Sequence, residues 1–163
     1  MKRSLELLVV AGIAIADQMT KLMVVTELGL LQTVTVIPGL LNLTHVRNSG
    51  VAFGILNSAE FAFKPALMAV FALGALVGVG LYATQLPLDH RWARAGLALI
   101  LGGAAGNLLD RARQGYVVDF VDVYWRGWHF WAFNVADSAI SIGMALIILD
   151  QMGVGRRRVP GTV

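Results

Sequence analysis

Long apolar runs separated by polar connections dominate the 163-residue chain. Four runs are long enough to cross the hydrocarbon core of a bilayer, because a helix rises about 1.5 Å per residue and a span needs about 20 residues. The sequence therefore predicts an all-α membrane protein, a four-transmembrane-helix bundle forming a single integral membrane domain over residues 1–163. The predicted spans lie at about 5–25, 66–86, 92–111 and 133–152.

The first run has an alternative interpretation as a cleaved secretory signal. Two basic residues precede it, and small residues at 14–16 imitate a cleavage site. However, the apolar pattern continues to Val25, and it contains Asp17 and Lys21 one helical turn apart. We therefore interpret the first run as a membrane span.

The connection between the first two spans has a different period. Residues 33–37 and 41–46 alternate polar and apolar side chains around Pro38 and Gly39, which is typical of two strands joined by a turn. A β-rich segment is predicted at about 30–60, with a small β-structure on the outer membrane surface. A short interfacial amphipathic helix is expected near 57–63. In the last connection, Trp125, Trp128 and Trp131 recur every third residue, which predicts an aromatic belt.

Composition narrows the possible chemistry. The chain is 57% hydrophobic and only 14% charged, whereas about a quarter of the residues of soluble domains are charged. There is no cysteine, which excludes disulfides, thiolate ligands and a cysteine nucleophile. His45, His90 and His129 lie far apart without zinc-hydrolase spacing. We expect no metal and no cofactor.

The net charge of +3 could suggest a nucleic-acid partner. In an apolar chain it more often reflects basic residues gathered on the cytoplasmic side, so no nucleic acid is expected. One side of the predicted spans has seven basic and three acidic residues, including a basic tail at 156–158. The other side has six basic and seven acidic residues. Both termini of this multi-pass protein are therefore predicted to be cytoplasmic.

Ionisable residues inside spans cost about 2.5–3.5 kcal/mol each at the membrane centre, so each calls for a partner or a role. In the predicted orientation these polar residues gather at the outer leaflet, and the inner halves contain almost nothing comparable. Several are spaced one helical turn apart, which fits structural ion pairs or hydrogen-bond clamps between helices. The residues are Asp17, Lys21, Asn107, Asp110, Arg111, Asp119, Asn134 and Asp137.

Small residues indicate where helices pack closely. Gly102, Gly103 and Gly106 form a small-residue face with GxxxG spacing, which favours a close approach of two helices. Gly74 and Gly78 predict the same for the second span.

Asp119 and Asp137 stand apart because neither has a basic residue at helical spacing. Two carboxylates that meet in a low dielectric share a proton, since both cannot ionise. The ionised member can activate water while the protonated member polarises a peptide carbonyl, which is peptide hydrolysis without a metal. The alternative is that each aspartate caps a helix or faces lipid headgroups.

Five blocks in order resemble lipoprotein signal peptidase, also called signal peptidase II, a family of aspartyl peptidases. They read DQMTK at 17–21, NSGVAFG at 48–54, GGAAGNLLDR at 102–111, VVDF at 117–120 and FNVADS at 133–138. The resemblance implies an aspartic endopeptidase with a catalytic dyad of Asp119 and Asp137. It also implies a β-cradle on the periplasmic side of the bundle.

Under this resemblance, substrates are diacylglyceryl-modified bacterial prolipoproteins, cut before the lipidated cysteine. The enzyme would lie in the bacterial cytoplasmic (inner) membrane as a monomer among phospholipids, with its site near the outer leaflet. Eight residues are expected to bind substrate or support the dyad: Asp17, Lys21, Asn48, Gly50, Asn107, Asp110, Arg111 and Asn134.

Two other functions remain possible from the residues alone. Intramembrane Asp, Lys and Arg also build proton and ion paths, so a small transporter is the main alternative. Such a path must cross both leaflets, whereas the predicted polar residues stop halfway. A non-catalytic scaffold, in which the aspartates only hold helices together, is the third interpretation.

Overall fold

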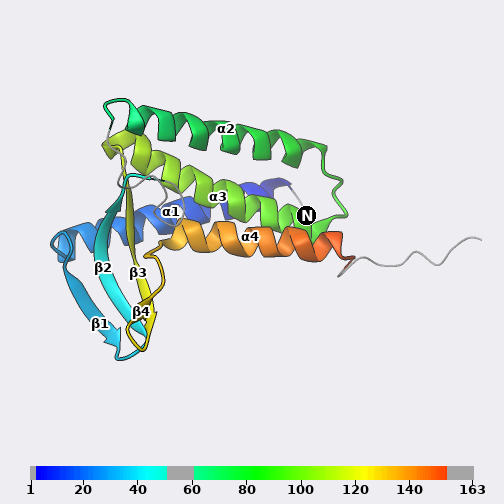
Figure 1. Cartoon of the computed structure of the whole chain (residues 1–163). Coiled ribbons are helices and arrows are strands. Elements are labelled where there is room, and N and C mark those ends of the chain that lie inside the picture. The colour runs from blue at the N-terminus through cyan, green and yellow to red at the C-terminus, as the bar shows by residue number, and fades with distance from the viewer. Residues whose placement is uncertain (1–2, 51–60, 154–163) are drawn as a thin grey trace, which may run out of the picture.

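A computed structural model describes residues 3–50 and 61–153. It is mostly helical, with a small antiparallel sheet at one end of the helices (Figure 1). The elements, in chain order, are α1 (Arg3–Glu27), β1 (Thr33–Ile37), β2 (Leu41–Asn48), α2 (Lys64–Gln85), α3 (Arg91–Gln114), β3 (Val117–Trp125), β4 (Trp128–His129) and α4 (Val135–Gln151).

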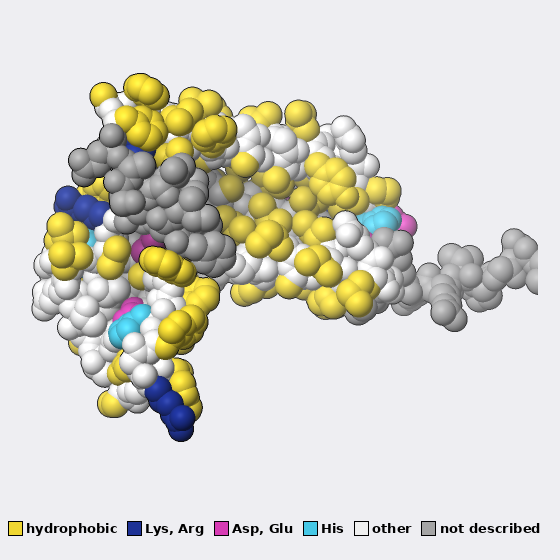
Figure 2. Space-filling view, in the orientation of Figure 1, with side chains coloured by type: hydrophobic (Ala, Val, Ile, Leu, Met, Phe, Trp, Pro, Cys, Tyr) yellow, Lys and Arg dark blue, Asp and Glu magenta, His cyan; other side chains and the backbone are white. Residues whose placement is uncertain are grey.

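Three helices, α1, α2 and α3, are long and apolar enough to cross a membrane. The predicted span at 133–152 corresponds to α4, which is shorter, at 17 residues. Hydrophobic side chains spread over the helices, while the charged side chains visible on this face lie at the two ends of the bundle and on the sheet (Figure 2). Large apolar side chains such as Leu7 and Leu8 are 69% and 68% exposed, which suits a surface solvated by lipid.

Helix α3 lies at the centre of the bundle and packs against α1, α2 and α4. Its glycines permit this approach. A Cβ atom at Gly102 would lie 2.8 Å from the Cβ atom of Ile13 on α1, and one at Gly103 would collide with the backbone of Ala136 on α4. The small-residue face of α3 is therefore a packing face. The same prediction for α2 is wrong, because a Cβ atom at Gly74 or Gly78 would meet nothing within 4 Å.

The sheet has the strand order β1-β2-β3-β4, and all of its pairings are antiparallel. The β1–β2 hairpin matches the predicted alternation around Pro38 and Gly39. Strands β3 and β4 were not predicted, although Val117–Trp125 is rich in the β-branched and aromatic residues that favour strands. Pairing of β2 with β3 sets Val46 opposite Asp119, so the sheet determines where this aspartate lies.

A buried apolar cluster joins the sheet to α1. Val24 near the end of α1 packs with Val118 and Phe120 of β3. At the far side of the sheet, the backbone N–H of Gly39 donates to the hydroxyl of Tyr124 at 2.7 Å. The strand that carries Asp119 is thus held against the end of a membrane-length helix.

Two expectations fall largely or wholly outside the described residues. The amphipathic helix near 57–63 is one of them, and only its last residues, 61–63, are described, as a turn before α2. The basic tail at 156–158 is the other. The three predicted belt tryptophans are 62–67% exposed, next to the β3–β4 hairpin.

The end of the bundle away from the sheet holds the start of α1, the α2–α3 connection and the end of α4 (Figure 1). The expectation that these halves of the helices contain almost nothing polar is wrong. Arg94 pairs with Glu6, and His90 contacts Asp150 at 2.9 Å. The two partners of each pair come from distant parts of the chain, so helical spacing within one segment does not reveal them.

Candidate active site

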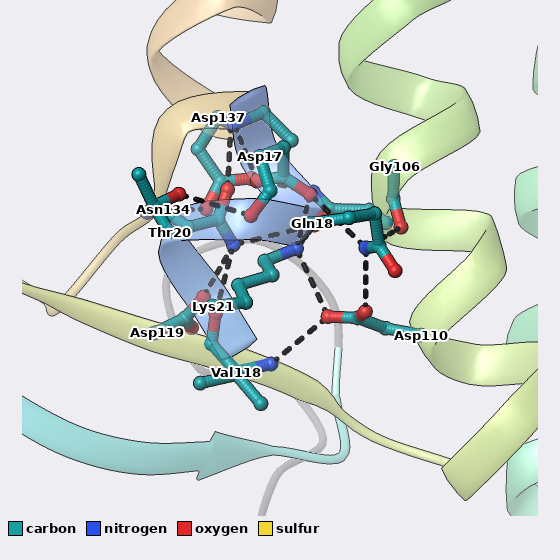
Figure 3. Close-up of polar contacts among 12 residues, drawn as sticks. Asp17, Gln18, Thr20, Lys21, Gly106, Asp110, Val118, Asp119, Asn134 and Asp137 are labelled. Atoms are coloured by element: carbon teal, nitrogen blue, oxygen red, sulfur yellow. Dashed lines mark hydrogen bonds and ion pairs between the residues drawn. The ribbon is translucent and has the colours of Figure 1, made fainter. Parts of the chain in front are cut away.

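Lys21 is the centre of a buried polar cluster where α1 crosses α3 (Figure 3). Its ammonium nitrogen lies 2.7 Å from Asp17 Oδ2 and 2.9 Å from Asp110 Oδ2, and it donates to Asn107 Oδ1 at 2.9 Å. The Lys21 side chain is only 4% exposed. The interpretation of these residues as an interhelical clamp therefore agrees with the geometry. Asp110 on α3 pairs with Lys21 on α1, and not with a residue of its own helix.

The two carboxylates around Lys21 also hold the elements that carry the other aspartates. Asp17 Oδ1 accepts a hydrogen bond from the backbone N–H of Ala136 at 2.9 Å, in the first turn of α4. Asp110 Oδ2 accepts from the backbone N–H of Val118 at 3.2 Å, on β3. The clamp thereby positions the start of α4 and the start of β3 against the same point of the bundle.

Asn134 contacts both predicted catalytic aspartates. It is the N-cap of α4, where its Oδ1 accepts from the backbone N–H of Asp137 at 2.9 Å and its own backbone N–H donates to Asp137 Oδ2 at 3.3 Å. Its Nδ2 donates to Asp119 Oδ1 at 2.7 Å. Asp137 therefore takes part in the capping box at the start of α4. Asn134, the other residue of this box, also holds Asp119 beside it.

Two further amides complete the surroundings of the aspartates. Asn107 Nδ2 donates to Asp137 Oδ1 at 2.9 Å, and Asn48 Nδ2 donates to Asp119 Oδ2 at 3.0 Å. Neither aspartate forms an ion pair within residues 3–50 and 61–153. Each carboxyl group is therefore held by neutral donors, which fix its position without cancelling its charge.

Burial raises the pKa of Asp119 from its ordinary value of 3.8 to about 7, and the negative charge of Asp137 adds to the effect. The amide donors of Asn48 and Asn134 and the charge of Lys21 oppose this rise in pKa. Asp119 is 2% exposed. A carboxyl group with a pKa near 7 is suited to exchange protons at neutral pH.

Arg111 and Gly50 support the site through Asn48, which donates to Asp119. The guanidinium of Arg111 donates to the carbonyl oxygens of Gly50 at 3.0 Å and of Asn107 at 3.2 Å. The backbone N–H of Gly50 donates to Asn48 Oδ1 at 3.0 Å. These contacts orient the side chain of Asn48, so that its Nδ2 faces Asp119.

Gln18 was not singled out from the sequence, although it stands in the first of the five motif blocks. Its Nε2 donates to Asp110 Oδ1 at 2.8 Å and to the carbonyl oxygen of Gly106 at 3.2 Å. A polar side chain next to Asp17 within an apolar run was the available signal. Among the described residues, no group of three or more His, Cys, Asp or Glu side chains could hold a metal ion.

Fold and site together define a helical membrane protein with a buried, carboxylate-rich site at one end of its bundle. The family model described as "Signal peptidase (SPase) II" matches residues 9–153. The lipoprotein signal peptidase of Geobacter sulfurreducens is 44% identical over 155 residues, 93% of this chain and 94% of that protein. That of Solibacter usitatus is 42% identical over 144 residues, 88% of each chain.

Two solved structures described as bacterial membrane enzymes have the same fold. One superposes with a TM-score of 0.81 at 30% identity and covers 98% of this chain and 94% of that one. The other has a TM-score of 0.79 at 28% identity, with 91% and 93% coverage. This chain belongs to the signal peptidase II family, and the resemblance drawn from its five motif blocks is confirmed.

Proposed function

We propose that this protein is an intramembrane aspartyl endopeptidase that removes signal peptides from diacylglyceryl-modified bacterial prolipoproteins, cutting before the lipidated cysteine. Membership of the signal peptidase II family supports the substrate class. The observation that carries the catalytic type is the double contact of Asn134, which donates hydrogen bonds to both Asp119 and Asp137. Asp119 and Asp137 therefore both contact one residue, and the negative charge of Asp137 raises the pKa of Asp119, as expected for two carboxyl groups that share a proton.

In this mechanism, the ionised carboxylate takes a proton from water, and the water oxygen attacks the peptide carbonyl carbon. The protonated carboxyl group donates to the carbonyl oxygen as negative charge develops there. Breakdown of the tetrahedral intermediate returns a proton to the departing amine. The two carboxyl groups titrate as a coupled pair, so these roles belong to the pair.

The remaining site residues position the pair and the substrate. Lys21, Asp17 and Asp110 clamp α1, α3, α4 and β3 together, so that the dyad is assembled before substrate arrives. Asn48 is the last residue of β2 and Gly50 follows the strand, where they are placed to orient the substrate backbone near the dyad. Such preorganisation spares the enzyme the cost of ordering these groups during the reaction.

We further propose that α4 is a fourth span, that both termini are cytoplasmic, and that the site lies near the outer leaflet of the bacterial inner membrane. The start of α1 and the end of α4 lie at one end of the bundle, and the sheet lies at the other (Figure 1). A lipidated substrate is already in the membrane. A site at this depth reaches the peptide beside the lipid anchor without extracting the acyl chains.

The test uses purified protein in detergent with a diacylglyceryl-modified precursor, with and without a chelator. Asp119→Asn and Asp137→Asn should each abolish cleavage while remaining folded, and the chelator should have no effect. Asp122→Asn is the matched control, because Asp122 lies on the same strand but contacts His129 and Asn42 instead. Full cleavage by either dyad variant would overturn the proposed mechanism.

A further inference from the structure

A second site lies at the end of the bundle opposite the dyad. There α1 and α2 both pack against α3, but within the described residues they barely contact each other. A crevice of about 240 Å³ remains between the three helices. None of the residues proposed for catalysis lines it, so the crevice is distinct from the proposed active site.

The charges of this crevice are not balanced. Arg94, which is 5% exposed, donates to Glu6 Oε1 at 2.6 Å and to the carbonyl oxygen of Leu86 at 2.7 Å. Arg94 and Glu6 therefore neutralise each other inside the wall. Arg3 also lines the crevice, is exposed, and has no ion-pair partner in the described part of the chain. The crevice therefore has one uncompensated positive charge.

Apart from Thr84, the rest of the crevice is apolar. Val10 of α1 and Leu97 and Leu101 of α3 form its wall, and Ala83 lines it from α2. An apolar cavity of about 150 Å³ stays dry and takes a small hydrocarbon in place of water. The larger crevice here is accordingly suited to a length of acyl chain.

We propose that this crevice binds one anionic phospholipid from the surrounding leaflet, with its phosphate on Arg3 and one acyl chain between α1 and α2. The positive charge of the crevice favours this occupant over the transmembrane segment of a signal peptide. Signal peptides begin with a positively charged region, which the free charge of Arg3 would repel. The proposal depends neither on the peptidase activity nor on which leaflet surrounds this end.

The experiment measures binding of spin-labelled phosphatidylglycerol and, separately, spin-labelled phosphatidylcholine to the full chain in phosphatidylcholine vesicles. The immobilised fraction of each label gives the preference for the anionic lipid. Arg3→Gln should lower this preference about fivefold, because one basic residue near a membrane surface contributes about 1 kcal/mol. Arg91→Gln is the matched control, since Arg91 is exposed at the same end of the bundle but does not line the crevice.

A second pair of variants tests the position of the acyl chain. Ala83→Phe should fill the crevice and abolish immobilisation of the labelled phosphatidylglycerol, whereas Ala75→Phe, on an exposed position of the same helix, should not. Thermal unfolding checks that each variant is folded.

Equal immobilisation of the two lipids by the unmodified protein would overturn the proposal, as would equal effects of Arg3→Gln and Arg91→Gln. Displacement of the lipid by a synthetic signal peptide would overturn it in favour of the substrate. Precursor cleavage, measured in parallel, tests the peptidase proposal separately.

Discussion

Replacing Asp119 with asparagine should stabilise the protein at alkaline pH while it abolishes cleavage. In the folded protein, burial keeps the carboxyl group protonated up to a pKa of about 7, whereas its ordinary pKa is 3.8. Between these values the folded state binds the proton and the unfolded state does not. This group therefore contributes most to stability below pH 3.8, and the contribution is lost as the pH rises through 7.

The size of the effect follows from the two pKa values and the local hydrogen bonds. The difference between 3.8 and about 7 corresponds to about 4 kcal/mol lost in full above pH 8. Asparagine has one acceptor oxygen, whereas both oxygens of Asp119 accept from amides, so the variant loses one hydrogen bond, worth about 1 kcal/mol. Asp119→Asn should therefore be more stable than the unmodified protein by about 3 kcal/mol at pH 8.

The assay is reversible unfolding in mixed micelles with sodium dodecyl sulfate, followed by tryptophan fluorescence at pH 5, 6, 7 and 8. The stability difference between Asp119→Asn and the unmodified protein should grow by roughly 2.5 kcal/mol from pH 5 to pH 8. Because both proteins share every other titrating group, the pH dependence of this difference reports the loss of the Asp119 carboxyl group together with its coupling to Asp137. A difference that stays constant with pH, or shrinks toward pH 8, would refute the assignment of a raised pKa to Asp119.

Three further predictions concern the supports of the site. Lys21→Met leaves the buried carboxylates of Asp17 and Asp110 without their positive partner, and should lower the free energy of unfolding by about 3–5 kcal/mol. An unchanged unfolding midpoint would contradict the role of Lys21 as the centre of the clamp. Gly106→Ala sets a methyl group 2.5 Å from Asp17 Oδ2 and should destabilise the folded protein by about 1–3 kcal/mol. Gly74→Ala adds a methyl group in open space and should stabilise the protein by up to about 1 kcal/mol. Thermal unfolding of both variants checks this, and equal shifts would count against it. Asn48→Ala removes a donor that lowers the pKa of Asp119, so the corresponding limb of the pH–rate profile should move to higher pH; movement to lower pH would exclude this role.

Local sequence patterns were enough to predict several elements. Apolar runs of membrane length predicted α1, α2 and α3, because solvation by lipid acts on each segment by itself. Alternation around Pro38 and Gly39 predicted the β1–β2 hairpin, since its two strands are neighbours in the chain. The five motif blocks, which are short and local, were sufficient to identify the family.

Pairings between distant segments could not be predicted in this way. The sequence showed Asp17 one turn from Lys21, but the contact of Lys21 with Asp110 depends on how α1 crosses α3. The pairing of Arg94 with Glu6 is likewise a contact between two helices. Helical spacing describes contacts within one helix only, so it cannot predict partners on neighbouring helices.

The sequence by itself determined which segments are apolar, where the first hairpin turns, and that neither Asp119 nor Asp137 has a basic residue at helical spacing. Only the tertiary structure decided that β3 joins the sheet and that Asn134 lies between Asp119 and Asp137. The physical reason is that hydrophobicity and turn preference belong to each segment, whereas burial, pKa and hydrogen-bond partners arise where segments far apart in the chain pack together.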